Sequence, residues 1–191
     1  MDRYTLEAIV DEIYGRAGAD PCAVVRPSRL ARALGLLLVR VPGQRPRGLY
    51  DGHRIAVRAG LPRAIEEWTI GHELGHWAGL GQDDEASANY VGAALQMPRR
   101  AFLRALAERP DAWHELGPLF GATSTSAAIR AAELEDRALA VVTPGRVYPR
   151  LIHLPDPEIR RLARDGGPGL SRTRLEDDPR RIVLEAIEID G

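Results

Sequence analysis

The stretch TIGHELGHWAGL, residues 69 to 80, places two histidines four positions apart, with a glutamate directly after the first. Residues four apart lie on one face of a helix, so His72 and His76 can direct two imidazoles at one metal ion. Glu73 then falls beside the ion, where it can take a proton from a water whose pKa the ion lowers to about 7. This HExxH pattern predicts a zinc centre, or a manganese centre, with Glu73 as its general base.

An alternative is that the two histidines are core residues that hydrogen-bond to backbone carbonyls. A buried helix normally carries leucine or alanine at such positions, because each buried imidazole needs polar partners. The spacing therefore favours a metal site over a structural pair.

A hydrolytic zinc site has three protein ligands and keeps its fourth position for water. Glu85 follows His76 by nine residues, and the two glycines in WAGLGQDD allow the chain to reverse between them. Asp83 and Asp84 are rivals, but aspartate at the start of a helix uses its oxygens to cap backbone N–H groups. We therefore expect Glu85 as the third ligand, with Asn89, one turn later, accepting a hydrogen bond from a ligand histidine.

Periodicity and turn residues predict an α+β chain. The apolar spacing near the start predicts a helix that ends near residue 17, followed by a short helix before Gly35 and a strand through LLLVRV. Asp51-Gly52 predicts a hairpin that joins GLY to HRIAVRA. Helices are expected from Pro62 to Gly79, from 85 to Pro98, after Pro98, and over 111–120 and 125–140. The tail should mix strands, RVYPRLIHL and RIVLEAIEI, with a helix near 156–164.

The composition limits the kinds of binding partner and of cellular compartment that we expect for the chain. The 191 residues carry a formal net charge of −1 and no run of five like charges, which gives no bulk signal for nucleic acid. All basic residues are arginine, a bias that we attribute to codon composition. Cys22 is the single cysteine, so no disulfide can form within the chain. Without a signal peptide or a long apolar window, we expect a cytoplasmic protein with no membrane segment.

Two motifs together resemble a known family. EWTIGHELGHWAGL followed by EASANYVGAALQMP is similar to the ImmA/IrrE-type metallopeptidases, in which HExxH precedes a helix of the form E…N…A…LLMP. The second motif matches at Glu85, Asn89, Ala93 and LQMP at 95–98. Gln96 stands where the family usually has leucine, and Ser87 where many members have a second acidic residue. The resemblance covers roughly residues 20 to 105, and more weakly the chain to about 140.

The resemblance implies a zincin-like metallopeptidase domain, a small sheet plus the HExxH helix, over residues 1–108. It also implies a helix-turn-helix-like pair of helices over 109–142. A C-terminal extension of mixed helix and strand is expected after this pair, over 143–191. Within the pair, ELGPLFGATSTSAAIRAAEL has core-like spacing around Gly121. Its second helix offers little beyond Arg130 for phosphates or guanine, so we expect direct DNA binding to be absent.

Family members cleave helix-turn-helix repressors, so the resemblance implies a zinc-dependent endopeptidase with a repressor of the XRE-like kind as substrate. An exposed edge strand at Arg54, Ile55, Ala56 and Val57 is our candidate for pairing with the substrate. The alternative is a non-catalytic, metal-containing regulator that binds a repressor, an antitoxin or DNA. Tyr90, His114 and His153 are possible oxyanion donors, and the sequence favours none of them.

Overall fold

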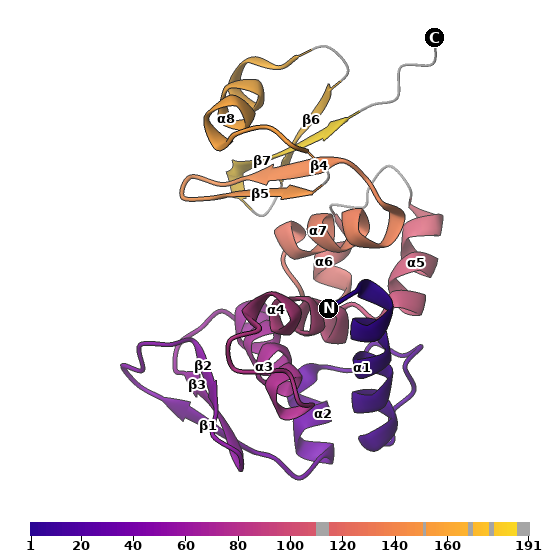
Figure 1. Cartoon of the computed structure of the whole chain (residues 1–191), viewed down its shortest axis with the longest axis vertical. Helices are drawn as coiled ribbons and strands as arrows, with labels where there is room; N and C mark the ends of the chain where they lie inside the picture. Colours follow the sequence, from indigo (N-terminus) through magenta and orange to yellow (C-terminus); the bar gives the residue numbers. More distant parts are fainter. Residues whose placement is uncertain (110–114, 151, 168–169, 176–177, 187–191) are drawn as a thin grey trace. The chain divides into compact units, whose positions relative to one another are not determined.

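The computed structural model of the chain describes residues 1–109, 115–150, 152–167, 170–175 and 178–186. These residues form a mixed α+β protein, as the sequence predicts (Figure 1). The helices are α1 (Arg3–Arg16), α2 (Pro27–Ala33), α3 (Arg63–Trp77), α4 (Glu85–Gln96), α5 (Arg99–Glu108), α6 (Leu116–Leu119), α7 (Ser124–Glu135) and α8 (Asp156–Asp165). The strands are β1 (Leu37–Val41), β2 (Gly48–Tyr50), β3 (Arg54–Arg58), β4 (Leu139–Val142), β5 (Val147–Arg150), β6 (Leu170–Leu175) and β7 (Asp178–Ala186).

The chain divides into two compact units. The first comprises Met1–Ala105 with Leu119–Ala122, and the second comprises Leu106–Pro118 with Thr123–Gly191. No helix in the described part of the chain is both long enough and apolar enough to cross a lipid bilayer.

In the first unit, the termini of the helices follow from local chemistry. Asp2 caps α1 by accepting a hydrogen bond from the Thr5 N–H at 3.0 Å, and Asp84 caps α4 by accepting one from the Ser87 N–H at 3.2 Å. Pro98 lies between α4 and α5, where the sequence predicts that it ends one helix and opens the next.

The first unit has a three-stranded sheet in the order β1-β3-β2. β1 runs parallel to β3, and β2 forms the predicted antiparallel hairpin with β3, across a turn that contains Gly52 at a φ of 97°. α3 packs against α2, α4, β2 and β3, so this helix is central to the unit. A strand next to α3 can therefore bring its backbone up to the side chains of that helix.

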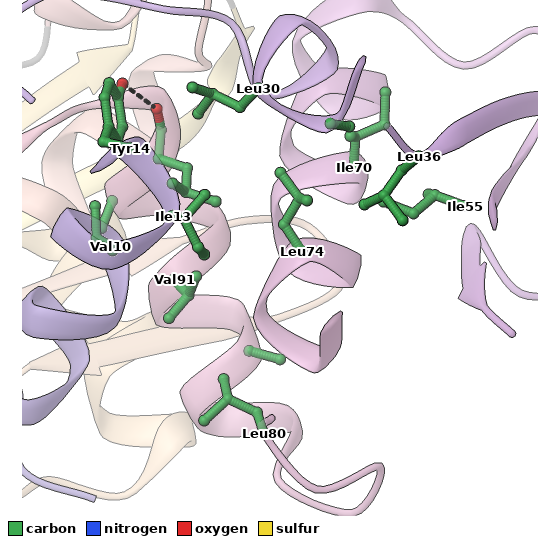
Figure 2. Packing of buried hydrophobic residues seen from close by; sticks show 14 of the residues in the cluster. Val10, Ile13, Tyr14, Leu30, Leu36, Ile55, Ile70, Leu74, Leu80 and Val91 are labelled. Atoms are coloured by element: carbon green, nitrogen blue, oxygen red, sulfur yellow. Dashed lines mark hydrogen bonds between the residues drawn. The ribbon is translucent and has the colours of Figure 1, made fainter. Parts of the chain in front are cut away.

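The core of the first unit joins the helices to the sheet (Figure 2). Its largest fully buried members come from α1, α2, α3, α4 and β3, and they include Ile13, Tyr14, Leu30, Ile55, Ile70, Leu74 and Leu95. The Tyr14 hydroxyl donates to the Leu95 carbonyl at 3.2 Å, which satisfies the one polar group of that buried ring. Burial raises the pKa of Tyr14 above its ordinary value, so the hydroxyl keeps its proton for this bond.

The second unit is built around a four-stranded antiparallel sheet in the order β5-β4-β7-β6. All four residues of β4 are buried, which means that both faces of this strand are covered. α8 packs on one face through Ile159 and Ala163, against Ala140 and Val142. The sequence predicts α8 correctly, but it does not predict β4 or β6.

One predicted helix is too long. The sequence predicts a helix over 125–140, whereas α7 ends at Glu135 and residues 139–142 form β4. Asp136 adopts a left-handed conformation, with a φ of 53°, and stops the helix. The run of alanines and leucines is compatible with both structures. Pairing with the nearby β5 and with β7, which is remote in sequence, favours the strand.

Candidate metal centre

The last two turns of α3 bring the two histidines of the motif together. His72 and His76 are both buried, and their Nε2 atoms lie 3.2 Å apart. Their rings meet nearly at right angles, at 77°, so the two Nε2 atoms point toward one region instead of stacking. This is the arrangement that the four-residue helical spacing predicts.

Glu85, the first residue of α4, completes the group. Its Oε2 lies 3.4 Å from His72 Nε2 and its Oε1 lies 3.8 Å from His76 Nε2. Ligands about 2.0–2.1 Å from a tetrahedral zinc ion are separated from one another by roughly 3.3 Å. The three side chains therefore form a group that could hold a metal ion. The carboxylate is 65% exposed, so the group is open to solvent on the Glu85 side.

The hydrogen bonds of the two rings determine which nitrogens are free. His72 Nδ1 lies 3.0 Å from Asn89 Oδ1, and His76 Nδ1 lies 3.4 Å from the Leu80 carbonyl oxygen. Both oxygens are acceptors, so both Nδ1 atoms carry the proton and both Nε2 atoms present lone pairs. Two lone pairs and a carboxylate that face one another repel unless a cation lies between them, so the donor set fits a divalent metal.

Burial further favours the neutral form of His72. The pKa of His72 is lowered, chiefly because burial disfavours the imidazolium, and His76 lowers it further, while Glu85 and Asn89 act in the opposite direction. Neutral imidazole is the form that binds metals, so the site is prepared for a ligand role.

Close packing of α3 on α4 brings the ligands within reach of one another. A Cβ at Gly71 would lie 3.0 Å from the Gly92 carbonyl oxygen, and a Cβ at Gly92 would lie 3.0 Å from the His72 nitrogen. The two helices thus meet backbone to backbone at this point, next to His72. Sequence reasoning missed both glycines, although a glycine in the interior of a helix is a signal of such contacts.

The two acidic rivals of Glu85 lie outside this group. Asp84 uses its carboxylate to cap α4, and the hydrogen bonds from Ser87 lower the pKa of this carboxyl. Asp83 is exposed, and no contact joins it to either histidine among the described residues.

Glu73 is buried beside the ligands. Its Oε2 accepts a hydrogen bond from the Tyr50 N–H of β2 at 2.8 Å, whereas no donor to Oε1 is found among the described residues. Burial raises the pKa of Glu73 above the ordinary value for glutamate, although the Tyr50 bond partly opposes this. A carboxylate with a raised pKa is a stronger base than an ordinary glutamate, which suits a group that takes up a proton and passes it on.

Gly48 of β2 makes room for Glu73. A Cβ at this position would lie 2.4 Å from Glu73 Oε1 and 2.6 Å from Thr69 Cγ2, closer than real atoms approach. From sequence alone, Gly48 is predicted only as part of a strand, because its contact with Glu73 joins residues far apart in the chain.

The predicted substrate-pairing strand is wrong. The residues proposed for it, Arg54 to Val57, form most of β3, which lies between β1 and β2 and is hydrogen-bonded on both sides. Ile55, Ala56 and Val57 are buried as well. The alternating pattern is also that of a central strand, and the parallel partner β1 could not be inferred from local sequence. The edge of the sheet beside α3 is β2.

The described part of the region predicted to be helix-turn-helix-like, within residues 109–142, holds α6, which is a single turn, then α7, and it ends in the strand β4. Residues 110–114, which belong to the predicted helix over 111–120 and include His114, lie outside the described residues. Arg130, the one basic residue named for DNA contact, is 0% exposed. A buried guanidinium cannot reach a phosphate or a base edge.

Two other possible oxyanion donors have different positions. The Tyr90 hydroxyl donates to Glu7 Oε1 at 2.5 Å, so its proton is already used within the first unit. His153 is exposed and belongs to the second unit.

Comparisons with known proteins add a fold relationship only. No protein-family model and no curated protein sequence matches the chain. A solved structure with a similar fold is a "Mycobacterium tuberculosis transcriptional regulator", with a TM-score of 0.66 and 13% sequence identity. The similarity covers 98% of this chain and 92% of that chain. At this identity, the similarity shows that the two chains share a fold.

Proposed function

We propose that the chain is a zinc-dependent endopeptidase of the ImmA/IrrE type, with a zincin-like first unit, that cleaves a helix-turn-helix transcriptional repressor. The observation that carries the proposal is the convergence of His72, His76 and Glu85 beside the buried carboxylate of Glu73. The sequence motifs that resemble the family provide these same residues.

Each residue has a distinct task in peptide hydrolysis. His72, His76 and Glu85 would hold the ion, and the hydrogen bond between Asn89 and His72 would keep that ring in its ligating tautomer. A bound zinc ion would acidify water and polarise the scissile carbonyl. Glu73 would take the proton from the attacking water and pass it to the leaving amine, while Tyr50 N–H keeps its carboxylate in place.

β2 replaces β3 as the proposed substrate-pairing strand. It is an edge of the three-stranded sheet, and its backbone already touches the general base through Tyr50 and Gly48. An extended peptide that added to this edge would lie beside Glu73. This geometry favours an unfolded or extended segment of the repressor as the site of cleavage.

The proposal is tested by incubating the zinc-loaded protein with purified helix-turn-helix repressors of the source organism and mapping new termini by mass spectrometry. Glu73→Gln should retain zinc and lower the cleavage rate by about 10²–10⁴-fold, because it removes the base. Glu12→Gln, which changes an exposed glutamate of α1, is the matched control and should cleave normally.

The alternative is a non-catalytic regulator that keeps the metal for stability and acts by binding a repressor, an antitoxin or DNA. Both proposals require the ligands, so zinc content alone does not separate them. Cleavage by the wild type and not by the Gln variant supports the peptidase. No cleavage of any repressor, together with a stable complex, supports the regulator.

A further inference from the structure

A second polar site lies in the first unit, among residues that the metal group does not use. It is a pocket of about 560 Å³ at the junction of α2, β1 and the first turns of α3. A volume of this size falls in the range of small-molecule sites, roughly 300–1,000 Å³. Every side chain that lines it is charged or carries a hydroxyl group.

The lining has an excess of positive charge. Five guanidinium groups and two carboxylates border the pocket, which leaves a formal charge of +3. The arginines are Arg26, Arg29, Arg32, Arg40 and Arg63. Like charges gathered in one concave site repel one another and raise the local concentration of anions.

The two carboxylates are occupied by other partners. Glu66 Oε1 accepts from Arg40 Nη2 at 2.5 Å. Glu67 accepts from the Ser28 N–H at 2.9 Å through Oε2 and from the Ser28 hydroxyl at 2.8 Å through Oε1. The buried Glu67 thus joins α2 to α3, and no ion pair links it to an arginine of the pocket among the described residues.

Four guanidinium groups are left over. Within the described residues, no hydrogen bond or ion pair engages the side chains of Arg26, Arg29, Arg32 or Arg63, and all four are exposed. Arg29 and Arg32 project from α2, whereas Arg63 is the first residue of α3. Two separate segments of the chain, α2 with its N-cap residue and the start of α3, therefore bring arginines without an ion-pair partner among the described residues to one hollow.

We propose that this pocket binds a small anion that carries at least two phosphate groups. The planar guanidinium donates two parallel hydrogen bonds to phosphate oxygens. The three excess positive charges of the lining are more than one phosphate group, at about −1.5 to −2, would balance. A diphosphate group could engage arginines of α2 and α3 at once.

The shape of the site favours a small polyanion over DNA. A duplex is bound by cations spread along an exposed face, whereas these arginines line a hollow. No lining side chain is aromatic, so the pocket has no aromatic platform on which the bases of a nucleic acid could stack. The pocket would thus recognise the negative charge of its ligand. The diphosphate group could belong to a nucleotide or be inorganic diphosphate.

The test is calorimetric titration of the full chain with inorganic diphosphate and ADP, beside orthophosphate and AMP. Arg29→Ala and Arg32→Ala should each weaken diphosphate binding by about tenfold or more, since a charge-assisted bidentate contact is lost. Arg104→Ala removes an exposed arginine of α5 and is the matched control. Circular dichroism checks that each variant is folded.

A metal-site control keeps this proposal separate from the peptidase, because phosphates also bind zinc. His76→Ala should bind diphosphate as the wild type does, whether or not the wild type cleaves a repressor. Tighter binding of ADP than of diphosphate would identify a nucleotide as the source, and equal binding would identify the inorganic ion.

Three results would overturn the proposal. They are the absence of diphosphate binding, an equal loss in Arg104→Ala, and orthophosphate binding as tight as that of diphosphate. A short DNA duplex that binds in an Arg29-dependent manner while diphosphate does not would also overturn it, and would assign the arginines to nucleic acid.

Discussion

Each end of α3 buries an acidic side chain, but the two carboxylates differ in their hydrogen-bond donors and in their neighbours. Near the first turns, Glu67 has a hydrogen-bond donor on each carboxylate oxygen, both from Ser28. Six residues later, Glu73 has one donor, Tyr50 N–H, and lies next to two imidazoles whose lone pairs face each other and the Glu85 carboxylate.

The difference separates a polar group that serves the fold from one to which we assign a function only as a proposal. A buried acceptor that meets a donor is satisfied within the protein and stabilises the fold. Lone pairs and a carboxylate that converge on one another can be satisfied by a cation placed between them. Along α3, the amino-terminal carboxylate therefore joins two helices, and the carboxyl-terminal group is arranged for a cation.

The largest expected effect is on metal binding. His76→Ala should lower zinc affinity by more than about 100-fold, because one of three ligands is lost and second-sphere losses alone reach that size. Competition with a chromophoric chelator measures it. His53→Ala removes an exposed histidine of the same unit and should leave the affinity unchanged. If both variants bind zinc equally, the carboxyl-terminal end of α3 is not a metal site.

A smaller effect is expected at Asn89. Asn89→Ala should weaken zinc binding by about 10–100-fold, because the His72 ring loses the acceptor that keeps the proton on Nδ1. Asn89→Asp retains an acceptor oxygen and should bind zinc close to the wild-type level. The same chelator competition distinguishes them, and a normal affinity in Asn89→Ala would contradict the role given to this bond.

Stability should respond to the space beside Glu73. Gly48→Ala should lower the free energy of unfolding by about 1–3 kcal/mol, since a Cβ at this position overlaps Glu73 and Thr69. Gly15→Ala is the control. Its Cβ would meet no atom within 4 Å, and alanine in a helix should stabilise by about 0.5–1 kcal/mol. Urea denaturation measures the free energy of unfolding of both variants. An unchanged value for Gly48→Ala would mean that β2 can move away from α3 to make room for the added methyl group.

The smallest effect compares the two glutamates directly. Glu67→Gln should destabilise the chain by about 1 kcal/mol, because a charged acceptor that serves two Ser28 donors becomes a neutral one. Glu73→Gln should leave the free energy of unfolding of the metal-free chain nearly unchanged, since the amide oxygen can still accept from Tyr50 N–H. Equal losses in the two variants would show that both carboxylates serve the fold in the same way.

The site was predictable where it rests on local geometry. A four-residue spacing on a helix brings His72 and His76 together in any fold. The aspartate that caps α4 and the glycine-containing bend before it point to Glu85 as the residue that comes back to the two histidines. The hairpin at Gly52 was predictable for the same reason, because its turn needs a positive φ.

Contacts between distant segments were not predictable. The parallel pairing of β1 with β3 converts the expected edge strand into a central one, and it joins residues on either side of β2. β4 could not be recognised from sequence, because it belongs to an apolar run that is equally compatible with a helix. The arginines of the pocket come from three segments, and the overall charge of −1 conceals their concentration in one place.

The amino-acid sequence by itself determined which residues could form a metal site, because the types and helical spacing of His72, Glu73 and His76 are local properties. Only the tertiary structure decided what surrounds that chemistry. The approach of Gly48 to Glu73, the close contact of α3 with α4 and the gathering of arginines all depend on packing between residues remote in the chain. Such packing is set by the shape and burial of whole elements, and short segments of sequence carry no direct record of it.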